Sequence, residues 1–292
     1  MARKRPPNDG NTCGTTFCFA GGREYSVTSI IHPTAVIDPE ATVGTNVSIG
    51  AYSVIGPNCV IGDGTVIGPH VVIEEHTHIG RECTIRSGAV LGGLPQDLKF
   101  KGERSYVRVG DRNMIREFVT IHRATGAEQA TSVGDDNLIM AYVHIGHNCA
   151  IANRTMISSY AGLSGHISIE EGVVIGGMVG VHQFVRIGKL AMLGGYSKVV
   201  QDVPPFMLAD GRPADILDLN VRGLRRSGLN AGSRANLKQA YKLLYRSNLN
   251  QSQALEAIEE EIEPEEAITY LVDFVKNISN GSSGRQLDKP RL

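Results

Sequence analysis

The amino-acid sequence predicts an all-β solenoid, a parallel β-helix, followed by a small C-terminal helical domain. Three observations support this fold. Aliphatic residues recur at every sixth position between Ile31 and Val199, glycine and proline gather at fixed offsets behind them, and helical spacing replaces this rhythm beyond residue 203. The composition, 41% hydrophobic and 20% charged over 292 residues, is typical of a folded protein rather than a disordered one.

The six-residue repeat predicts the β-helix. Of its 29 positions between residues 31 and 199, 26 are aliphatic, and the exceptions are Asp97, Glu103 and Ala127. An α-helix cannot bury such a period, whereas short strands joined by tight corners can, because glycine relaxes the backbone and proline presets φ at a corner. Three strands make one triangular coil, and coils stack about 4.8 Å apart. Residues 18 positions apart therefore lie in one column, with the aliphatic side chains inward.

Beyond the repeat, Leu237, Tyr241 and Leu244 recur at helical intervals, and Asn250 is suited to cap a further helix. Basic residues concentrate between 184 and 246 and acidic residues between 251 and 276, which indicates either solvated helix faces or a docking patch for an acidic partner. The predicted organisation is a leader over 1–29, a β-helix over 30–203 with excursions at 92–108 and 123–132, a C-terminal helical domain over 204–280, and a tail over 281–292.

Charge and hydropathy exclude several classes of protein. The net charge of −1 gives no general attraction to nucleic acid, and no apolar run approaches the ~18 residues of a membrane span. The leader lacks the apolar stretch of a secretory signal, and its acidic residues argue against a transit peptide in favour of a floppy extension or a misplaced start codon. We interpret the five cysteines as reduced thiols. A cytoplasmic location is expected.

The stretch MAYVHIGHNCAIAN, residues 140 to 153, carries the candidate chemistry. The repeat turns Val143, Ile145 and Cys149 inward, so His144 and His147 are expected to face outward. Column spacing then gathers further polar residues on the same wall, because positions 18 and 36 residues beyond this stretch stack on it. The predicted cluster consists of His144, His147, Asn148, His166, His182 and Gln183.

Such an imidazole cluster is consistent with ordinary surface histidines, with a zinc site, or with general base catalysis. No cysteine is expected to face outward beside the histidines, and we predict no metal. Gly165 follows His147 in its column, so a base would lie next to a residue that leaves room for substrate and offers a bare N–H to an oxyanion. Acyl transfer to an alcohol requires both of these groups, a base and an oxyanion donor. Since no activated serine or cysteine is evident, direct transfer without a covalent enzyme intermediate is favoured.

Six motifs extend the interpretation to a family. The chain resembles the acyl-[acyl-carrier-protein]–UDP-N-acetylglucosamine O-acyltransferases, which catalyse the first step of lipid A biosynthesis, over residues 30 to 280. The resemblance implies a left-handed β-helix, although parallel crossovers are generally right-handed. It also implies a homotrimer with sites between subunits, and transfer of an (R)-3-hydroxyacyl group from the phosphopantetheine arm of acyl carrier protein, with no separate cofactor. The motifs are PQDLKF (95–100), IREFVTIHR (115–123), AGLSGH (161–166), IGGMVGVHQF (175–184), QDVPPFM (201–207) and LNVRGLRRSG (219–228).

The resemblance also assigns roles to residues. The catalytic base falls on His147 and the oxyanion amide on Gly165. Gly177 and Gly195 end a column of small residues. Their lack of side chains predicts either a groove for the hydrocarbon chain or simply a tight corner of the backbone. The remaining predicted substrate-binding residues are Asp97, Lys99, His122, His144, Asn148, His166, His182 and Gln183, with Asn220 and Arg226 at the uridine nucleotide.

Two departures from the family pattern and two rival functions stay open. Asn148 stands where an aspartate commonly follows the catalytic histidine, and Arg222 occupies a position that is often acidic. A related N-acyltransferase acts on an already acylated glucosamine, but it carries an N-terminal uridine-binding domain for which the leader is too short. A non-catalytic β-helix scaffold is expected to show flat repetitive faces rather than clustered imidazoles and two excursions.

Overall fold

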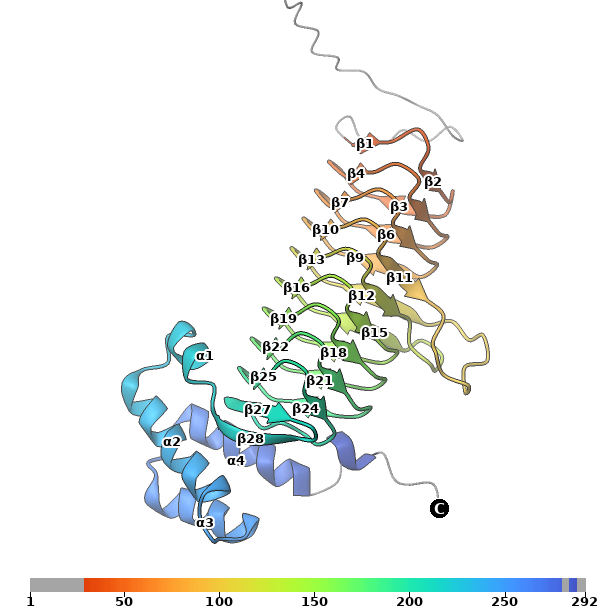
Figure 1. Cartoon of the computed structure of the whole chain (residues 1–292). Helices are drawn as coiled ribbons and strands as arrows, with labels where there is room; N and C mark the ends of the chain where they lie inside the picture. The colour runs from red at the N-terminus through yellow and green to blue at the C-terminus, as the bar shows by residue number, and fades with distance from the viewer. Residues whose placement is uncertain (1–28, 280–283, 288–292) are drawn as a thin grey trace, which may run out of the picture.

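The computed structural model describes residues 29–279 and 284–287. The leader predicted over 1–29 lies outside this part of the chain except for Ser29, as does most of the predicted tail. The described residues form a prism of short strands with helices packed at the end opposite β1 (Figure 1). None of these helices combines the length and the apolarity that a membrane span requires.

Three sheets, parallel except where β28 pairs with β27, make up the walls of a left-handed β-helix, which confirms the predicted fold class. The first sheet, here called wall A, contains β1 (Ile30–Ile31), β4 (Ser48–Ile49), β7 (Val66–Ile67), β10 (Thr84–Ile85), β13 (Met114–Ile115), β16 (Leu138–Ile139), β19 (Met156–Ile157), β22 (Val174–Ile175), β25 (Met192–Leu193), β27 (Met207–Gly211) and β28 (Ala214–Leu219). Wall B contains β2 (Val36–Ile37), β5 (Val54–Ile55), β8 (Val72–Ile73), β11 (Val90–Gly93), β14 (Thr120–His122), β17 (His144–Ile145), β20 (Gly162–Leu163), β23 (Gly180–Val181) and β26 (Lys198–Val199). Wall C contains β3 (Thr42–Val43), β6 (Val60–Ile61), β9 (Thr77–Ile79), β12 (Tyr106–Val109), β15 (Ala130–Val133), β18 (Ala150–Ile151), β21 (Ser168–Ile169) and β24 (Arg186–Ile187).

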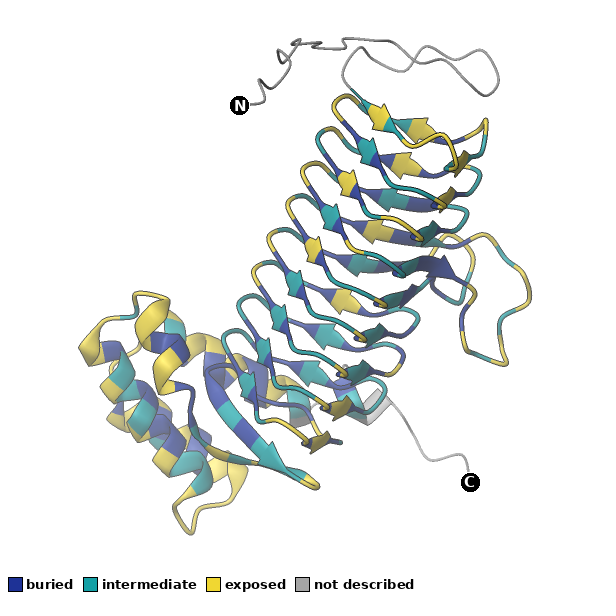
Figure 2. Ribbon diagram, turned by 45° about the horizontal axis from the view of Figure 1, so that its top comes forward, coloured by how far each residue is buried: buried dark blue, intermediate teal, exposed yellow. Residues whose placement is uncertain are grey.

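In most repeats the aliphatic residue ends its short strand and points into the prism. Ile145, Leu163 and Ile175 are fully buried, while the residues before them are partly exposed. Figure 2 shows buried residues alternating with more exposed ones along the coils. Parallel pairing keeps a register of 18 residues in wall B, where His144 pairs with Gly162, and Gly162 pairs with Gly180. The columns predicted from the sequence are therefore present in the structure.

Two loops interrupt the corner between walls B and C. They connect β11 to β12 and β14 to β15, at residues 94–105 and 123–129, and lie within the predicted excursions 92–108 and 123–132. Both project from one edge of the prism (Figure 1). Hydrogen bonds join them, because the Gly126 N–H donates to Glu103 Oε1 at 2.7 Å and Arg104 pairs with Glu128. The two loops thus form one unit beside wall B.

The C-terminal region begins with a β-hairpin that the sequence analysis did not predict. β27 adds to β25 in parallel and β28 returns antiparallel to it, so sheet structure continues to Leu219 within the segment predicted as helical. Within the described part of the C-terminal region, four helices and a short 3₁₀ turn follow, with a second apolar core around Leu224, Leu237 and Ile258. Asn250 caps its helix through a capping box. The helices are α1 (Val221–Arg226), α2 (Ala231–Tyr245), α3 (Gln251–Glu261) and α4 (Glu266–Ser279), and the turn is η1 (Gly284–Leu287).

Candidate active site

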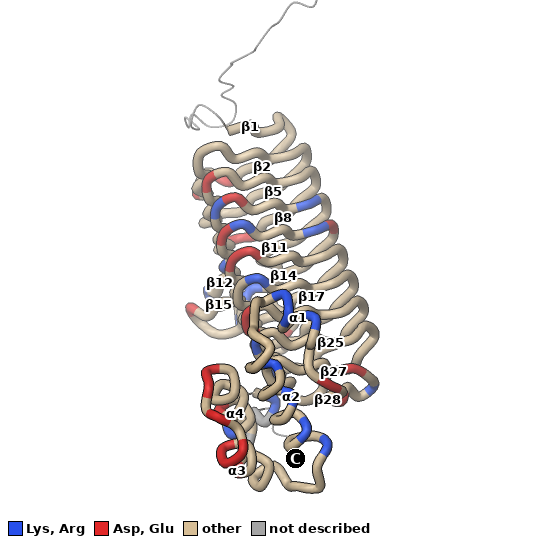
Figure 3. Tube along the Cα trace, turned by 90° about the vertical axis from the view of Figure 1, so that its left-hand side faces the viewer, with Lys and Arg blue, Asp and Glu red and all other residues tan. Residues whose placement is uncertain are grey.

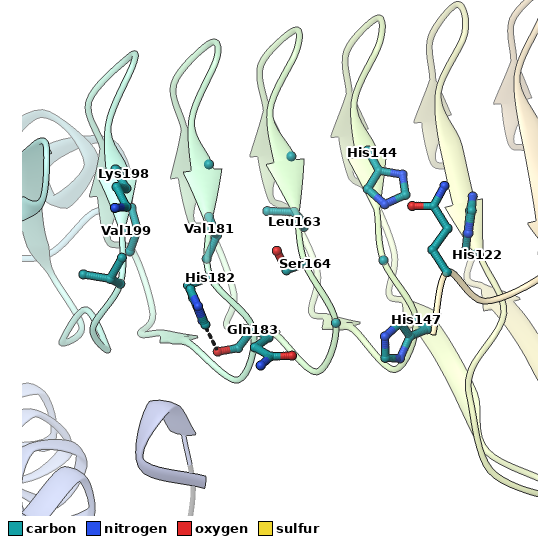
Figure 4. Close-up of a pocket in the computed structure, with 16 residues that line it drawn as sticks. His122, His144, His147, Leu163, Ser164, Val181, His182, Gln183, Lys198 and Val199 are labelled. Atoms are coloured by element: carbon teal, nitrogen blue, oxygen red, sulfur yellow. Dashed lines mark hydrogen bonds between the residues drawn. The ribbon is translucent and has the colours of Figure 1, made fainter. Parts of the chain in front are cut away.

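A groove of about 560 Å³ runs along the outer face of wall B and the corner that follows it (Figure 4). Six predicted site residues line it, while His166 and Asn148 lie in the adjoining corner positions. Gln96 and Lys198 also line the groove, and the sequence analysis did not predict them. None of the lining residues is acidic, and Lys198 is the only lysine or arginine among them. The six predicted residues that line the groove are His122, His144, His147, Gly165, His182 and Gln183.

His147 lies directly against Gly165 in the next coil. A Cβ built on Gly165 would lie 2.6 Å from both Cε1 and Nε2 of the His147 ring. Only a residue without a side chain leaves this ring in place, because real Cβ contacts do not occur below 3.0 Å. Gly165 is buried, and its N–H finds no acceptor within residues 29–279 and 284–287. The structure therefore places an imidazole beside an unengaged backbone donor.

Asn148 occupies the corner position after His147, with a left-handed φ of 58° that asparagine tolerates better than most residues. Its Oδ1 lies 2.9 Å from His147 Nδ1 and accepts the Thr125 N–H at 2.9 Å. Its Nδ2 donates to the Thr125 carbonyl at 3.0 Å. Asn148 therefore connects the His147 ring to the loop 123–129.

Burial lowers the pKa of His122, His144 and His166 below the ordinary value for histidine. Positive charge on a neighbouring ring lowers each pKa further. These three imidazoles are consequently neutral near pH 7 and can both donate and accept hydrogen bonds. Thr120 Oγ1 lies 2.8 Å from His144 Nδ1 and orients that ring.

The first loop places Asp97 and Lys99 near the groove. The Lys99 N–H donates to Asp97 Oδ1 at 3.0 Å, which lowers the pKa of this carboxyl, and the His147 charge lowers it further. Neither residue is among those that line the groove. The loop is held at its base by Arg123, which is buried, pairs with Glu75 at 2.7 Å and lies over the Phe100 ring.

Other predicted residues lie apart from the His147 cluster. Asn220 is buried as the cap of α1, where Oδ1 accepts the Gly223 N–H and Nδ2 donates to the Leu190 carbonyl. Arg226 is exposed at the end of α1. Gly177 and Gly195 stack on the neighbouring corner, where a Cβ on Gly195 would lie 3.4 Å from the Gly177 carbonyl oxygen. Within this single chain these residues do not share the groove.

Cys149 follows Asn148 in the sequence but points into the core. Its thiol donates to the Ser164 carbonyl at 3.0 Å, and burial raises its pKa to about 12. A thiol with this pKa supplies almost no thiolate at neutral pH. Cys149 therefore does not act as a nucleophile in the groove.

A prism of six-residue repeats whose outer wall carries this imidazole groove defines a transferase of the hexapeptide-repeat class. The family described as bacterial transferase hexapeptide matches residues 28–62, 58–93 and 130–165. A second family, described as Udp N-acetylglucosamine O-acyltransferase, Domain 2, matches residues 202–284.

Individual relatives narrow the class to one family. The acyl-[acyl-carrier-protein]–UDP-N-acetylglucosamine O-acyltransferase of Gloeothece citriformis is 49% identical over 63% of this chain, and the match spans 66% of that protein's length. The enzyme of the same name from Burkholderia mallei is 46% identical over 66% of this chain and 76% of its own. The solved UDP-N-acetylglucosamine acyltransferase of Bacteroides fragilis superposes with a TM-score of 0.83 at 41% identity, over 85% of this chain and 97% of that one. The chain belongs to the family of acyl-[acyl-carrier-protein]–UDP-N-acetylglucosamine O-acyltransferases.

Proposed function

We propose that this protein transfers an (R)-3-hydroxyacyl group from acyl carrier protein to the 3-hydroxyl of UDP-N-acetylglucosamine, as the first step of lipid A biosynthesis. Both the donor protein and the acceptor nucleotide sugar appear in the names of its relatives from Gloeothece citriformis and Burkholderia mallei. The observation that carries the proposal is the contact between the His147 ring and the bare backbone of Gly165. This contact brings a base and an oxyanion donor to one reacting centre.

The reaction requires one proton acceptor and one oxyanion donor. Nε2 of His147 removes the proton of the sugar hydroxyl while that oxygen attacks the thioester carbonyl carbon. The carbonyl electron pair moves to its oxygen, where the Gly165 N–H stabilises the negative charge. The intermediate then collapses, the carbon–sulfur bond breaks, and the leaving thiolate takes the proton from His147. The products are the ester and the free thiol of the carrier arm.

The groove suits an extended acceptor with a negative charge away from the reacting hydroxyl. Lys198 lies three strands along wall B from His144, about 14 Å at the usual strand spacing (Figure 4). No lining carboxylate opposes its charge. A nucleotide sugar offers a neutral sugar ring to the histidines and a diphosphate further along the groove.

The C-terminal helices offer a surface for the acidic carrier protein. Figure 3 shows lysine and arginine residues along α1 and α2, where acidic residues are sparse. Acidic residues gather instead on α3 and α4. Arg222, Arg225 and Arg226 on α1 are exposed. We propose this basic face as the docking surface, because complementary charge steers association. A homotrimer in the cytoplasm, with the groove closed by a neighbouring subunit, completes the proposal.

The reaction itself is the test. The purified protein is incubated with UDP-N-acetylglucosamine and a series of (R)-3-hydroxyacyl carrier proteins of different chain length, and the products are identified by mass spectrometry and NMR. We expect one acyl group esterified to the 3-oxygen of the sugar, with the free carrier thiol formed in equal amount. Acylation at another position of the sugar, or no transfer from any donor, would refute the proposed function.

A further inference from the structure

The first loop, residues 94–105, leaves wall B beside Arg123. Its last sheet residue, Gly93, pairs with His122 across a register shift, and the Arg123 N–H donates to the Gly93 carbonyl at 3.0 Å. The loop then brings Gln96 to the groove that His122 and His144 also line. The contacts that fix the loop beside Arg123 therefore also fix the position of Gln96.

The Arg123 side chain lies between the prism and the first loop. Its guanidinium pairs with Glu75, at the corner after β8, with 2.7 Å between Nη2 and Oε1. The ring of Phe100, from the loop, has its centroid 5.7 Å from the guanidinium carbon. The Phe100 N–H donates to the Asp97 carbonyl at 3.0 Å, so the anchored residue also closes the turn that follows Gln96. Arg123 thus connects a corner of the prism to the turn next to the groove.

Arginine is a poor choice at this place for stability alone. Its side chain is 6% exposed, and the side chain of its partner Glu75 stays 44% exposed. Arg123 Nε has no hydrogen-bond acceptor among residues 29–279 and 284–287. A buried donor without an acceptor is costly, and apolar side chains of similar volume often stabilise a protein as well as a buried ion pair does. What arginine adds is geometry, because its planar group can pair with a carboxylate and stack on a ring at once.

We infer that Arg123 is a positioning residue, which holds the first loop closed against wall B and so keeps Gln96 beside the histidines of the groove. Arg123 is not among the residues that line the groove, so its influence passes through the loop. The inference rests on the proposed function for its kinetic consequences.

The expected consequence is weaker substrate binding rather than slower chemistry. His147 and Gly165 belong to the prism, so their contact is expected to persist when the loop opens. Substrate must then close the loop as it binds, and the apparent affinity falls by the fraction of molecules in which the loop is closed. Loss of the Arg123 contact should therefore raise KM and leave kcat nearly unchanged.

The kinetic test uses Arg123→Lys, Phe100→Leu and the double variant. Lysine keeps the charge but not the planar group, and leucine keeps an apolar side chain but not the ring. We expect each single variant to raise the KM for UDP-N-acetylglucosamine roughly tenfold and to change kcat by less than about threefold, because the loop is closed in the saturated complex. The double variant should be no worse than the single ones, since both changes break the same contact.

Arg108→Lys is the matched control. Arg108 is exposed on wall C, where its guanidinium carbon lies 5.2 Å from the centroid of the Tyr106 ring. It repeats the pairing of an arginine with an aromatic ring on a different wall from the groove, and we expect this variant to keep the wild-type kcat and KM. Phe100 is only partly buried, so Phe100→Leu is expected to fold and tests the contact independently of Arg123→Lys.

Limited digestion with trypsin reports on the loop without turnover. The loop offers three exposed cleavage sites, at Lys99, Lys101 and Arg104. Cleavage requires local opening of the backbone, so its rate follows the fraction of open molecules. We expect mass spectrometry to show that the loop is cut about tenfold faster in Arg123→Lys and Phe100→Leu than in the wild type, and at the wild-type rate in the control.

Faster cleavage of the loop together with a raised KM would support the inference. Wild-type cleavage rates in both variants, or a loss of kcat with unchanged KM, would overturn it. A lower thermal unfolding midpoint without faster cleavage of the loop would assign Arg123 a merely structural role and would also overturn it. Absence of acyl transfer by the wild type would refute the proposed function instead, and the cleavage rates would still decide the role of Arg123.

Discussion

Replacing His147 with alanine is expected to lower kcat by roughly 10³-fold, within the range that a positioned general base contributes. The expectation follows from the groove, where the Nε2 edge of this ring lies against the Gly165 backbone. The neighbouring rings of His122, on the preceding coil, and His144, earlier on the same coil, are neutral and do not share this contact. The measurement is steady-state kinetics with saturating carrier protein and nucleotide sugar.

A matched control for this variant is His70→Ala. His70 occupies a different corner of the prism, where its ring stacks on the exposed Tyr52 ring at 5.3 Å. We expect this control to retain wild-type kcat, and we expect both variants to elute as the wild-type assembly. Turnover by His147→Ala within tenfold of the wild type would remove His147 from the role of base.

Gly165→Ala should have the second largest effect, a loss of roughly 10²-fold in kcat. Its new Cβ would lie 2.6 Å from Cε1 and Nε2 of His147, so either the ring or the coil must move. A shift of about 1 Å in a catalytic group is enough to cost about this much. The backbone of Gly165 itself tolerates alanine, since its φ lies outside the left-handed region.

The consequence is a variant that folds but is impaired in turnover. We expect its thermal unfolding midpoint to stay within a few degrees of the wild-type value, because the displaced ring borders the groove and not the apolar core. The loss should appear mainly in kcat, measured beside the KM of each substrate. Unchanged kcat would show that the His147–Gly165 contact is not the reacting centre.

The sequence predicted the fold and the central pair because a period of six specifies both the direction and the column of each side chain. Ile145 and Cys149 are buried as expected, which leaves His147 outward and stacked on Gly165. The two hydrogen bonds between Asn148 and Thr125 could not be predicted from the period of six. These residues lie 23 positions apart, across a loop that breaks the 18-residue spacing, so no column joins them.

The other unpredicted features have similar causes. The β27–β28 hairpin continues wall A after the repeat has ended, where its strands are longer and no longer follow the period of six. Gln96 lies in a loop whose course the period does not describe, and Lys198 stands apart from the histidines in the sequence, so the imidazole pattern does not indicate it. For Asn220 and Arg226 the role at the nucleotide stays a prediction, since both lie apart from the groove in the single chain.

The most direct test of the account is a crystal structure of this protein with the product, UDP-3-O-(hydroxyacyl)-N-acetylglucosamine, bound. The ester oxygen at the sugar 3-position should lie about 2.6–3.2 Å from His147 Nε2, with the acyl carbonyl oxygen within hydrogen-bonding distance of the Gly165 N–H. A product bound with its ester beside another histidine, or outside the wall B groove, would contradict the mechanism.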